Sequence, residues 1–175
     1  MRVIAGEFRS RKLVSVEGAG TRPTSDRLRE TLFNIIGPEV RGAVFIDAYA
    51  GTGAVGIEAI SRGAEQAVFI EKDRKALEAI RNNLKTLGIA ERARVIAGGV
   101  SSNLGKLEAD ILFVDPPYEQ EREYQESLQT TMASPPGLAI VQHSVRFEPA
   151  VQYGELHRYR VVKQGDNALS FYRKA

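Results

Sequence analysis

Short apolar runs recur through the middle of this chain, and each is followed by a turn and a segment with helical spacing of its apolar residues. The runs expected to form strands are 43–47, 67–71, 94–97, 110–114 and 138–142. The helices are expected over about 25–36, 54–61, 74–87 and 120–132, with a short one within 99–107. Strands that alternate with helices pack as a parallel sheet with helices on both faces. The sequence therefore predicts a doubly wound α/β fold.

The end of the chain departs from this alternation. Residues 156–163 alternate like a half-exposed strand, Gln164–Asn167 form a turn, and residues 168–173 resume as a strand. Two strands joined by a tight turn form an antiparallel hairpin. Together with the earlier runs this predicts a mostly parallel sheet of seven strands, closed at one edge by an antiparallel C-terminal hairpin.

The beginning of the chain also departs from it. Apolar runs at 3–6 and 12–16 flank a basic segment. We expect residues 1–20 to form a small basic β-hairpin arm that stands outside the main fold. Residues 21–175 are then expected to form the main domain.

The composition excludes several kinds of site. The chain has 175 residues, no cysteine, and two histidines without a partner at ligand spacing. Disulfides, thiolate metal sites and cysteine nucleophiles are therefore excluded, and we expect no metal. No apolar run approaches the ~20 residues of a membrane span, and no signal-peptide core is present. The expected location is the cytoplasm, without membrane contact.

The net charge of +2 is unevenly distributed. Residues 1–41 carry eight basic and five acidic residues, residues 42–157 carry 11 and 16, and residues 158–175 carry five and one. The net charges are thus +3, −5 and +4. If the two ends meet in space they form one basic face, which would suit a phosphate backbone.

A glycine-rich loop, Gly51-Thr52-Gly53-Ala54-Val55-Gly56, follows the first apolar run. It matches the G-x-G-x-x-G pattern of dinucleotide-binding enzymes, and Glu71 stands where an acid would hold the ribose. Two features disfavour a nicotinamide cofactor. Asp47 ends the strand before Tyr49 and Ala50, and a carboxylate there repels pyrophosphate but suits a cationic ligand. The chain also lacks a second nucleotide-binding half.

Asp115-Pro116-Pro117-Tyr118 ends the fourth apolar run. Proline has no N–H to donate and fixes φ, so the strand stops in a stiff loop that presents a carboxylate, carbonyl groups and an aromatic ring. Ligands of open α/β sheets bind at this edge of the sheet. The ring can stack on a planar base while the carboxylate and a carbonyl accept hydrogen bonds from its amino group. A strand-terminating turn with a packed tyrosine is the alternative.

Together these segments resemble the Rossmann-like methyltransferases that use S-adenosylmethionine. Asp47 to Gly53 is similar to their first cofactor motif, and Asp115 to Tyr118 resembles the (D/N)PP(Y/F) motif of enzymes acting on exocyclic amines. The resemblance implies that Asp47 serves the methionine part of the cofactor, Glu71 the ribose, and Asp115 the substrate amine.

One departure concerns the adenine of the cofactor. Many relatives have an acid after the third strand, where this chain has Gly98-Gly99-Val100, so backbone and apolar contacts would hold the adenine. The cofactor-binding residues expected from the resemblance are Asp47, Tyr49, Ala50, Gly51, Thr52, Gly53, Glu71, Lys72, Gly99 and Val100.

Further segments agree in order and spacing with one family over nearly the whole chain. The most discriminating is Thr21-Arg22-Pro23-Thr24-Ser25-Asp26-Arg27-Leu28-Arg29-Glu30, and Arg2–Gly6, Ser61–Ala64 and Glu71–Asp73 agree as well. The chain resembles the bacterial RsmD family, which methylates the N2 amine of a guanine in small-subunit ribosomal RNA, of the guanine-966 type. The implied partner is this RNA, free or within a partly assembled 30S subunit, and the protein is expected to be a monomer.

The same resemblance assigns roles to individual residues. The catalytic loop would be Asp115, Pro116, Pro117 and Tyr118, with Asp115 and the Pro116 carbonyl accepting from the amine. The segment bordering the cofactor pocket would add Arg22, Pro23 and Thr24. The residues expected to contact RNA phosphates are Arg2, Arg9, Arg11, Lys12 and Arg22.

Two rival functions remain open from the sequence. An enzyme acting on adenine N6 in RNA or DNA would need the same motif, and a non-catalytic RNA-binding protein could retain a cofactor-like loop. Among other polar residues, His143 and Ser144 are interpreted as structural because neighbours on a strand face opposite sides. Asn82 and Asn83 are interpreted as surface or capping groups.

Overall fold

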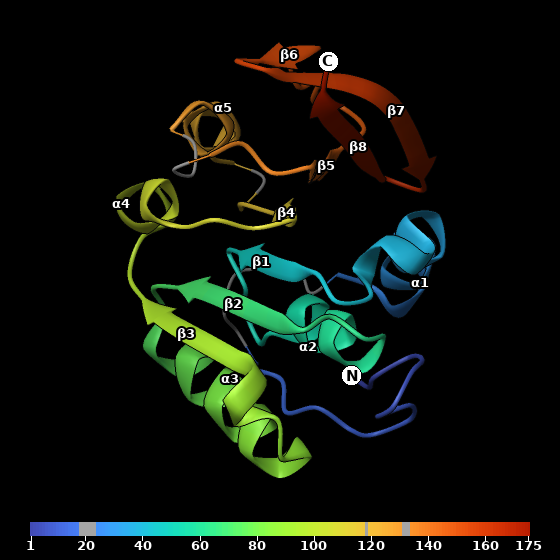
Figure 1. Cartoon of the computed structure of the whole chain (residues 1–175), viewed down its shortest axis with the longest axis vertical. Coiled ribbons are helices and arrows are strands. Elements are labelled where there is room, and N and C mark those ends of the chain that lie inside the picture. Colours follow the sequence, from blue (N-terminus) through green and yellow to red (C-terminus); the bar gives the residue numbers. More distant parts are fainter. Residues whose placement is uncertain (18–23, 118, 131–133) are drawn as a thin grey trace.

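One eight-stranded sheet runs through the molecule in the order β3-β2-β1-β4-β5-β8-β7-β6 (Figure 1). The computed structural model describes residues 1–17, 24–117, 119–130 and 134–175. Strands β1 to β5 pair parallel with one another, and the pairs β5–β8, β8–β7 and β7–β6 are antiparallel. The strands are β1 Val44–Ala48, β2 Gln66–Glu71, β3 Ala93–Ala97, β4 Ile111–Val114, β5 Leu138–Ser144, β6 Gln152–Tyr153, β7 Leu156–Gln164 and β8 Asn167–Lys174. The mostly parallel α/β sheet with its antiparallel C-terminal hairpin is confirmed.

The expectation of seven strands was wrong by one. The additional strand, β6, has two residues and pairs with the start of β7. It is held by Tyr153, which is buried and meets the ring of Tyr172 with centroids 5.6 Å apart. Two residues are too few to show the period-two alternation from which strands are predicted.

Helices cover both faces of the sheet. One face carries α1 Asp26–Ile36, α2 Ala54–Ser61 and α3 Arg74–Leu87, and the other carries α4 Val100–Asn103 and α5 Glu121–Gln129. Short 3₁₀ turns lie at η1 Gly37–Val40, η2 Ala90–Arg92 and η3 Leu104–Lys106. Side chains cap the first turns of two helices, since Ser25 Oγ accepts from Leu28 N at 3.2 Å and Asp73 Oδ1 accepts from Ala76 N at 2.8 Å.

The N-terminal segment, residues 1–17, pairs antiparallel with itself as expected but does not stand outside the main fold. Arg2 and Lys12 form an antiparallel bridge, Val3 N donates to Arg11 O at 2.9 Å, and Leu13 N donates to Met1 O at 3.0 Å. Val3 and Leu13 are buried in a cluster with side chains of α2 and α3. The apolar residues that suggested a hairpin therefore anchor the segment on the helices instead of forming a separate arm.

Two buried polar side chains fix this segment. Glu58 on α2 accepts from the backbone N–H groups of residues 4–5 at 2.9 and 3.0 Å. Asn83 on α3 accepts from Val14 N at 2.7 Å, and its amide donates to Val14 O at 3.1 Å and Thr52 O at 3.2 Å. The interpretation of Asn83 as a surface or capping group was wrong, because it joins the N-terminal segment to the glycine-rich loop.

The two basic ends of the chain, residues 1–41 and 158–175, meet in part. Arg173 Nη2 donates to Glu39 Oε1 at 2.6 Å, and Leu169 and Phe171 of β8 pack in one cluster with side chains of α1. The segment 1–17 lies apart from the C-terminal strands, because Figure 1 places the N-terminus beside α2 and the C-terminus at the opposite end of the molecule, next to β6 and β7. A shared basic face therefore stays a prediction for the region of α1, and residues 1–17 lie outside it. Within the described ranges, no helix has the length and apolar character needed to cross a membrane.

Candidate active site

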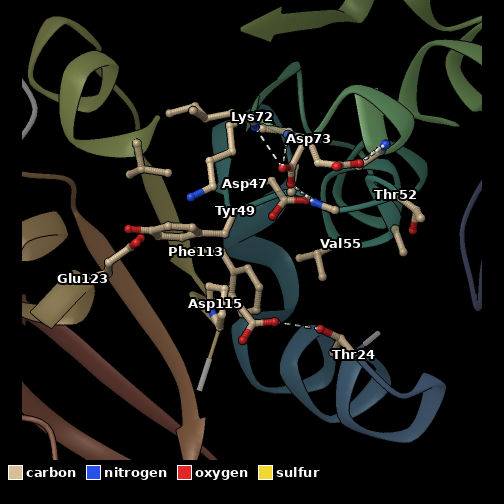
Figure 2. A pocket seen from close by; sticks show the side chains of 18 of the residues that line it. Thr24, Asp47, Tyr49, Thr52, Val55, Lys72, Asp73, Phe113, Asp115 and Glu123 are labelled. Atoms are coloured by element: carbon tan, nitrogen blue, oxygen red, sulfur yellow. Dashed lines mark hydrogen bonds between the residues drawn. The ribbon is translucent and has the colours of Figure 1, made fainter. Parts of the chain in front are cut away.

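A cavity of about 450 Å³ opens at the carboxyl ends of β1, β2 and β4 (Figure 2). The helix after β1 lies on one face of the sheet and the helix after β4 lies on the other. The connections that follow these two neighbouring strands therefore lead in opposite directions. The crevice that they leave between them is where open α/β sheets bind ligands. The volume falls in the range of about 300–1,000 Å³ that is usual for small-molecule sites.

Asp47, in β1, forms the most buried acidic part of this cavity, with 1% of its surface exposed. Its Oδ2 accepts from Gly56 N at 2.9 Å. Burial raises the pKa of Asp47 well above its ordinary value; the Gly56 hydrogen bond opposes this, and the charges of Asp115 and Glu71 add to it. A cation bound here would favour the ionised form of Asp47.

Two glycines of the loop after β1 serve packing. Gly53 has φ 82°, and a Cβ added there would lie 3.3 Å from the ring of Phe69. A Cβ on Gly56 would lie 2.4 Å from the same ring, which is closer than atoms can approach. These glycines let α2 lie against β2. Gly53, predicted to bind the cofactor, does not line the cavity, whereas Gly51 and Thr52 do.

Glu71, at the end of β2, fastens the glycine-rich loop. Its Oε2 accepts from Gly51 N at 2.8 Å, and its Oε1 accepts from Lys72 N and Asp73 N, both at 2.9 Å. Three of the roughly four acceptor positions of a carboxylate are thereby used by backbone groups. The cavity wall at β2 is therefore set before any ligand arrives.

Tyr49 extends from the loop after β1 toward α5, as Figure 2 shows. Its hydroxyl lies 2.8 Å from Ser127 Oγ. Burial and then a hydrogen bond with Glu123 raise the pKa of the Tyr49 phenol. This side chain joins the loop after β1 to α5 beside the cavity and stays neutral at physiological pH.

The described lining of the cavity is strongly acidic. It includes six carboxyl side chains but one basic side chain, that of Lys72. The acids are Asp47, Glu71, Asp73, Asp115, Glu123 and Glu126. A pyrophosphate would be repelled here, whereas a ligand with ammonium and sulfonium charges would be attracted.

Asp115 follows β4 at the edge of the cavity. Its Oδ2 lies 3.3 Å from Thr24 Oγ1, and the same hydroxyl lies 3.2 Å from Oε1 of the buried Gln142. Burial raises the pKa of Asp115 to about 7, while the hydrogen bond from Thr24 lowers it. Pro117 also lines the cavity, but Pro116 does not.

The other predicted residues fall in three groups. Tyr118, Arg22 and Pro23 lie outside the described residues. Arg2, Arg9, Arg11 and Lys12 are exposed on the N-terminal segment, where Arg2 lies 3.7 Å from Asp26 and Arg11 donates to Thr86 O at 3.3 Å. The predicted cofactor residues that line the cavity are Thr24, Asp47, Tyr49, Ala50, Gly51, Thr52, Glu71, Lys72, Gly99 and Val100.

Sequence reasoning missed several residues of the wall. Met1, Ser15 and Val16 line the cavity, because the N-terminal segment folds back along the glycine-rich loop. Glu123 and Glu126 reach it from α5. Their i, i+3 spacing on a helix after the Asp-Pro-Pro loop was a signal that could have been used. The buried Gln142 does not line the cavity but contacts Thr24, and it was missed because it ends an apolar run.

His143 and Ser144 are structural within the described part of the chain, as expected. His143 Nε2 lies 2.8 Å from Ser170 Oγ, and its Nδ1 lies 2.8 Å from Ser144 O. Both ring nitrogens are thereby engaged. Burial lowers the pKa of His143.

Comparison with known proteins places the chain in a family. The family described as "Conserved hypothetical protein 95" matches residues 1–173. A Bacillus subtilis protein named as a candidate rRNA methyltransferase, YlbH, is 35% identical over 99% of both chains. The ribosomal RNA small subunit methyltransferase D of Escherichia coli K12 is 43% identical over 122 residues, which are 69% of this chain and 61% of that protein.

A solved structure agrees with these sequence relatives. The Escherichia coli protein yhhF, described as a candidate methyltransferase, superposes with a TM-score of 0.84 at 35% identity, covering 99% of this chain and 97% of that one. The eight-stranded sheet is therefore that of a Rossmann-like methyltransferase. The chain belongs to the RsmD family, the family of the ribosomal RNA small subunit methyltransferases D.

Proposed function

We propose that this protein transfers a methyl group from S-adenosylmethionine to the N2 amine of a guanine in small-subunit ribosomal RNA. The observation that carries the proposal is the pairing of an acid-lined cavity at β1 and β2 with Asp115 beside it at β4. The cavity suits a cationic cofactor, and Asp115 offers an acceptor to an amine. The names of the relatives support the class of reaction and the class of RNA.

The residues of the cavity fit the cofactor. Asp47 would hold its ammonium group, Glu71 its ribose through acceptor capacity that the backbone leaves free, and Gly99 and Val100 its adenine. The bound cofactor supplies a methyl group on a sulfonium. The closed turn of the glycine-rich loop, set by Glu71, lets Gly51 and Thr52 face the ligand without rearrangement.

The substrate side is built around Asp115. The lone pair of a guanine N2 is delocalised into the ring, so the amine must be oriented before it can attack. Asp115 and the Pro116 carbonyl would accept its two N–H groups and aim the nitrogen at the methyl carbon. The predicted stacking of Tyr118 on the base completes this part of the proposal.

A base in folded RNA must leave its stack to reach Asp115, at a cost of a few kcal/mol. The exposed Arg9, Arg11 and Lys12 would offset this through phosphate contacts that weaken with salt. We propose that the protein works as a monomer in the cytoplasm. Its substrate would be free RNA or a partly assembled 30S subunit.

Calorimetric titration with S-adenosylmethionine, its demethylated product and NAD, in parallel, tests the cofactor. We expect binding of the first two and none of NAD; the reverse would refute the proposal. Methyl transfer to small-subunit RNA, naked and with ribosomal proteins bound, then tests the reaction, with Asp115→Ala as the inactive control. Digestion of the product to nucleosides should give N2-methylguanosine, and N6-methyladenosine would establish the rival reaction instead.

A further inference from the structure

A buried glutamine stands behind the reacting carboxylate. Val114 of β4 pairs with Val141 of β5, so Asp115 and Gln142 follow on neighbouring strands. Gln142 is 3% exposed, and its Oε1 lies 3.2 Å from Thr24 Oγ1, which lies 3.3 Å from Asp115 Oδ2. These polar groups form a row that leads from the cavity into the sheet.

The number of protons in this row restricts how it can be bonded. The Thr24 hydroxyl has one proton and lies between two oxygens, so it donates to one of them at a time. With a proton on Asp115 Oδ2, the acid donates to Thr24, and Thr24 donates to Gln142. With Asp115 ionised, Thr24 donates to the carboxylate and its oxygen can accept from the other side.

A glutamine suits both arrangements. A half-turn of its terminal amide exchanges Oε1 for Nε2 at nearly the same place. Gln142 can therefore accept from Thr24 in the first arrangement and donate to it in the second. An apolar side chain of the same volume would offer neither group.

We propose that Gln142 is a positioning residue for methyl transfer. With Thr24 it forms a relay whose hydrogen bonds reverse direction when Asp115 takes the proton of the substrate amine. The chemical step rests on the proposed function: the nitrogen–carbon bond forms as the methyl–sulfur bond breaks, the sulfonium becomes a neutral thioether, and one N–H proton passes to Asp115 Oδ2. Gln142 stabilises the protonated product of that step by accepting from Thr24.

The charges around Asp115 come from several elements. The ionisable side chains that line the same cavity are Asp47 of β1, Glu71 of β2, Lys72 and Asp73 after β2, and Glu123 and Glu126 of α5. None of them is replaced in the Thr24 and Gln142 variants, which exchange one uncharged residue for another. A change in the titration of Asp115 then reports on the relay.

The test is the titration of the Asp115 carboxyl by carbon-13 NMR in the free protein, with the signal assigned by its loss in Asp115→Asn. In Gln142→Met the Thr24 hydroxyl has no acceptor when Asp115 is protonated, whereas it can still donate to the carboxylate when Asp115 is ionised. The protonated form therefore loses more than the ionised form. The midpoint of the Asp115 titration should therefore fall by about half a pH unit to one pH unit. Thr24→Val removes the donor, so the midpoint should rise, and Thr24→Ser should restore it.

The direction in which the midpoint of the Asp115 titration changes distinguishes the relay from a role of Gln142 in packing alone. If Gln142 acted only by polarity, its loss would deepen the desolvation of Asp115 and raise the midpoint. A rise or no change in Gln142→Met therefore overturns the relay, as does an equal shift when Gln142→Met is added to Thr24→Val. Gln142→Leu repeats the test if the methionine variant does not fold, and cofactor binding reports folding.

Activity gives a second measure. We expect kcat of Gln142→Met at pH 8 to fall about tenfold with unchanged affinity for S-adenosylmethionine, and an unchanged kcat would contradict the proposal. The NMR titration uses neither RNA nor cofactor. Absence of methyl transfer by the unaltered protein would refute the proposed function, while the titration decides the relay independently.

Discussion

The acids at the ends of β2 and β4, Glu71 and Asp115, line the same cavity but differ in the number and length of their hydrogen bonds. Glu71 accepts from three backbone N–H groups at 2.8 to 2.9 Å. Asp115 meets a single hydroxyl among the described residues, at the longer distance of 3.3 Å. The burial that raises the pKa of Asp115 to about 7 is offset only in part by this bond.

This difference separates structure from chemistry within one site. A carboxylate whose acceptor positions are filled by backbone donors holds the loop around it in place. One with spare acceptor positions and a high proton affinity is suited to receive an amine and its proton. On the proposed function, Glu71 would order the cofactor loop and Asp115 would take part in the reaction.

Replacing Asp115, the acid with a single hydrogen-bond partner in the described part of the chain, should have the largest effect on activity. Asp115→Ala leaves the backbone of the cofactor loop untouched, so binding of S-adenosylmethionine should stay within about twofold of the unaltered protein. Transfer should fall by at least about 100-fold, because the amine is no longer oriented or deprotonated. Single-turnover methylation and calorimetry measure the two quantities. Near-normal transfer would remove Asp115 from the mechanism.

Replacing Glu71, the acid bonded to three backbone N–H groups, should instead lower the stability of the protein and its affinity for the cofactor. Glu71→Ala leaves Gly51, Lys72 and Asp73 without an acceptor, which should lower the free energy of unfolding by about 1–3 kcal/mol. The affinity for S-adenosylmethionine should fall at least about tenfold, since the loop is no longer fixed. Urea denaturation and calorimetry test this. Wild-type affinity in this variant would show that the loop orders without Glu71.

The raised pKa of Asp115 also predicts how stability depends on pH. The folded state holds the proton up to about pH 7, whereas the unfolded chain releases it near 3.9. The folded state thus binds more protons in this window, and the contribution of Asp115 makes the protein less stable as the pH rises from about 4 to 7.

Asp115→Asn sharpens this point, because an amide accepts hydrogen bonds but does not titrate here. At pH 8 the variant should be about 1–3 kcal/mol more stable than the unaltered protein, and near pH 4 the two should be equal. Because Asp115 must be ionised to accept the amine proton, the activity of the unaltered protein should rise through pH 7, and the variant should lack this rise. Equal stability at pH 8 would mean that Asp115 has an ordinary pKa.

The strand tips were predictable from sequence because their signals are local. An apolar run followed by Asp47, Glu71 or Asp115 fixes the strand, its end and the edge of the sheet to which the acid belongs. The short helix α2 was predicted for the same reason, since it begins after the glycine-rich loop and ends at Arg62-Gly63.

Contacts between distant segments were not predictable. Gln142 and Thr24 lie 118 positions apart, and neither has a local pattern that marks its partner. The N-terminal segment was misjudged because Val3 and Leu13 stand in short apolar runs of the kind that form strands, although what they bury is the side of two helices. The fold could thus be predicted from the periodicity of apolar residues. The hydrogen bonds of the site could not, because they depend on which distant segments the fold brings together.

Asn83 allows a specific test of these long-range hydrogen bonds, with the smallest expected effect. It is the one residue whose amide contacts both Val14 and Thr52 among the described hydrogen bonds. Asn83→Ala should weaken binding of S-adenosylmethionine about two- to fivefold, because Thr52 O and the Ser15–Val16 wall lose a shared support. Asn82→Ala, on the exposed side of the same helix, is the matched control. Hydrogen exchange at Val14 N–H should quicken in the first variant alone; equal protection in both would show that buried apolar contacts hold the N-terminal segment in place without this amide.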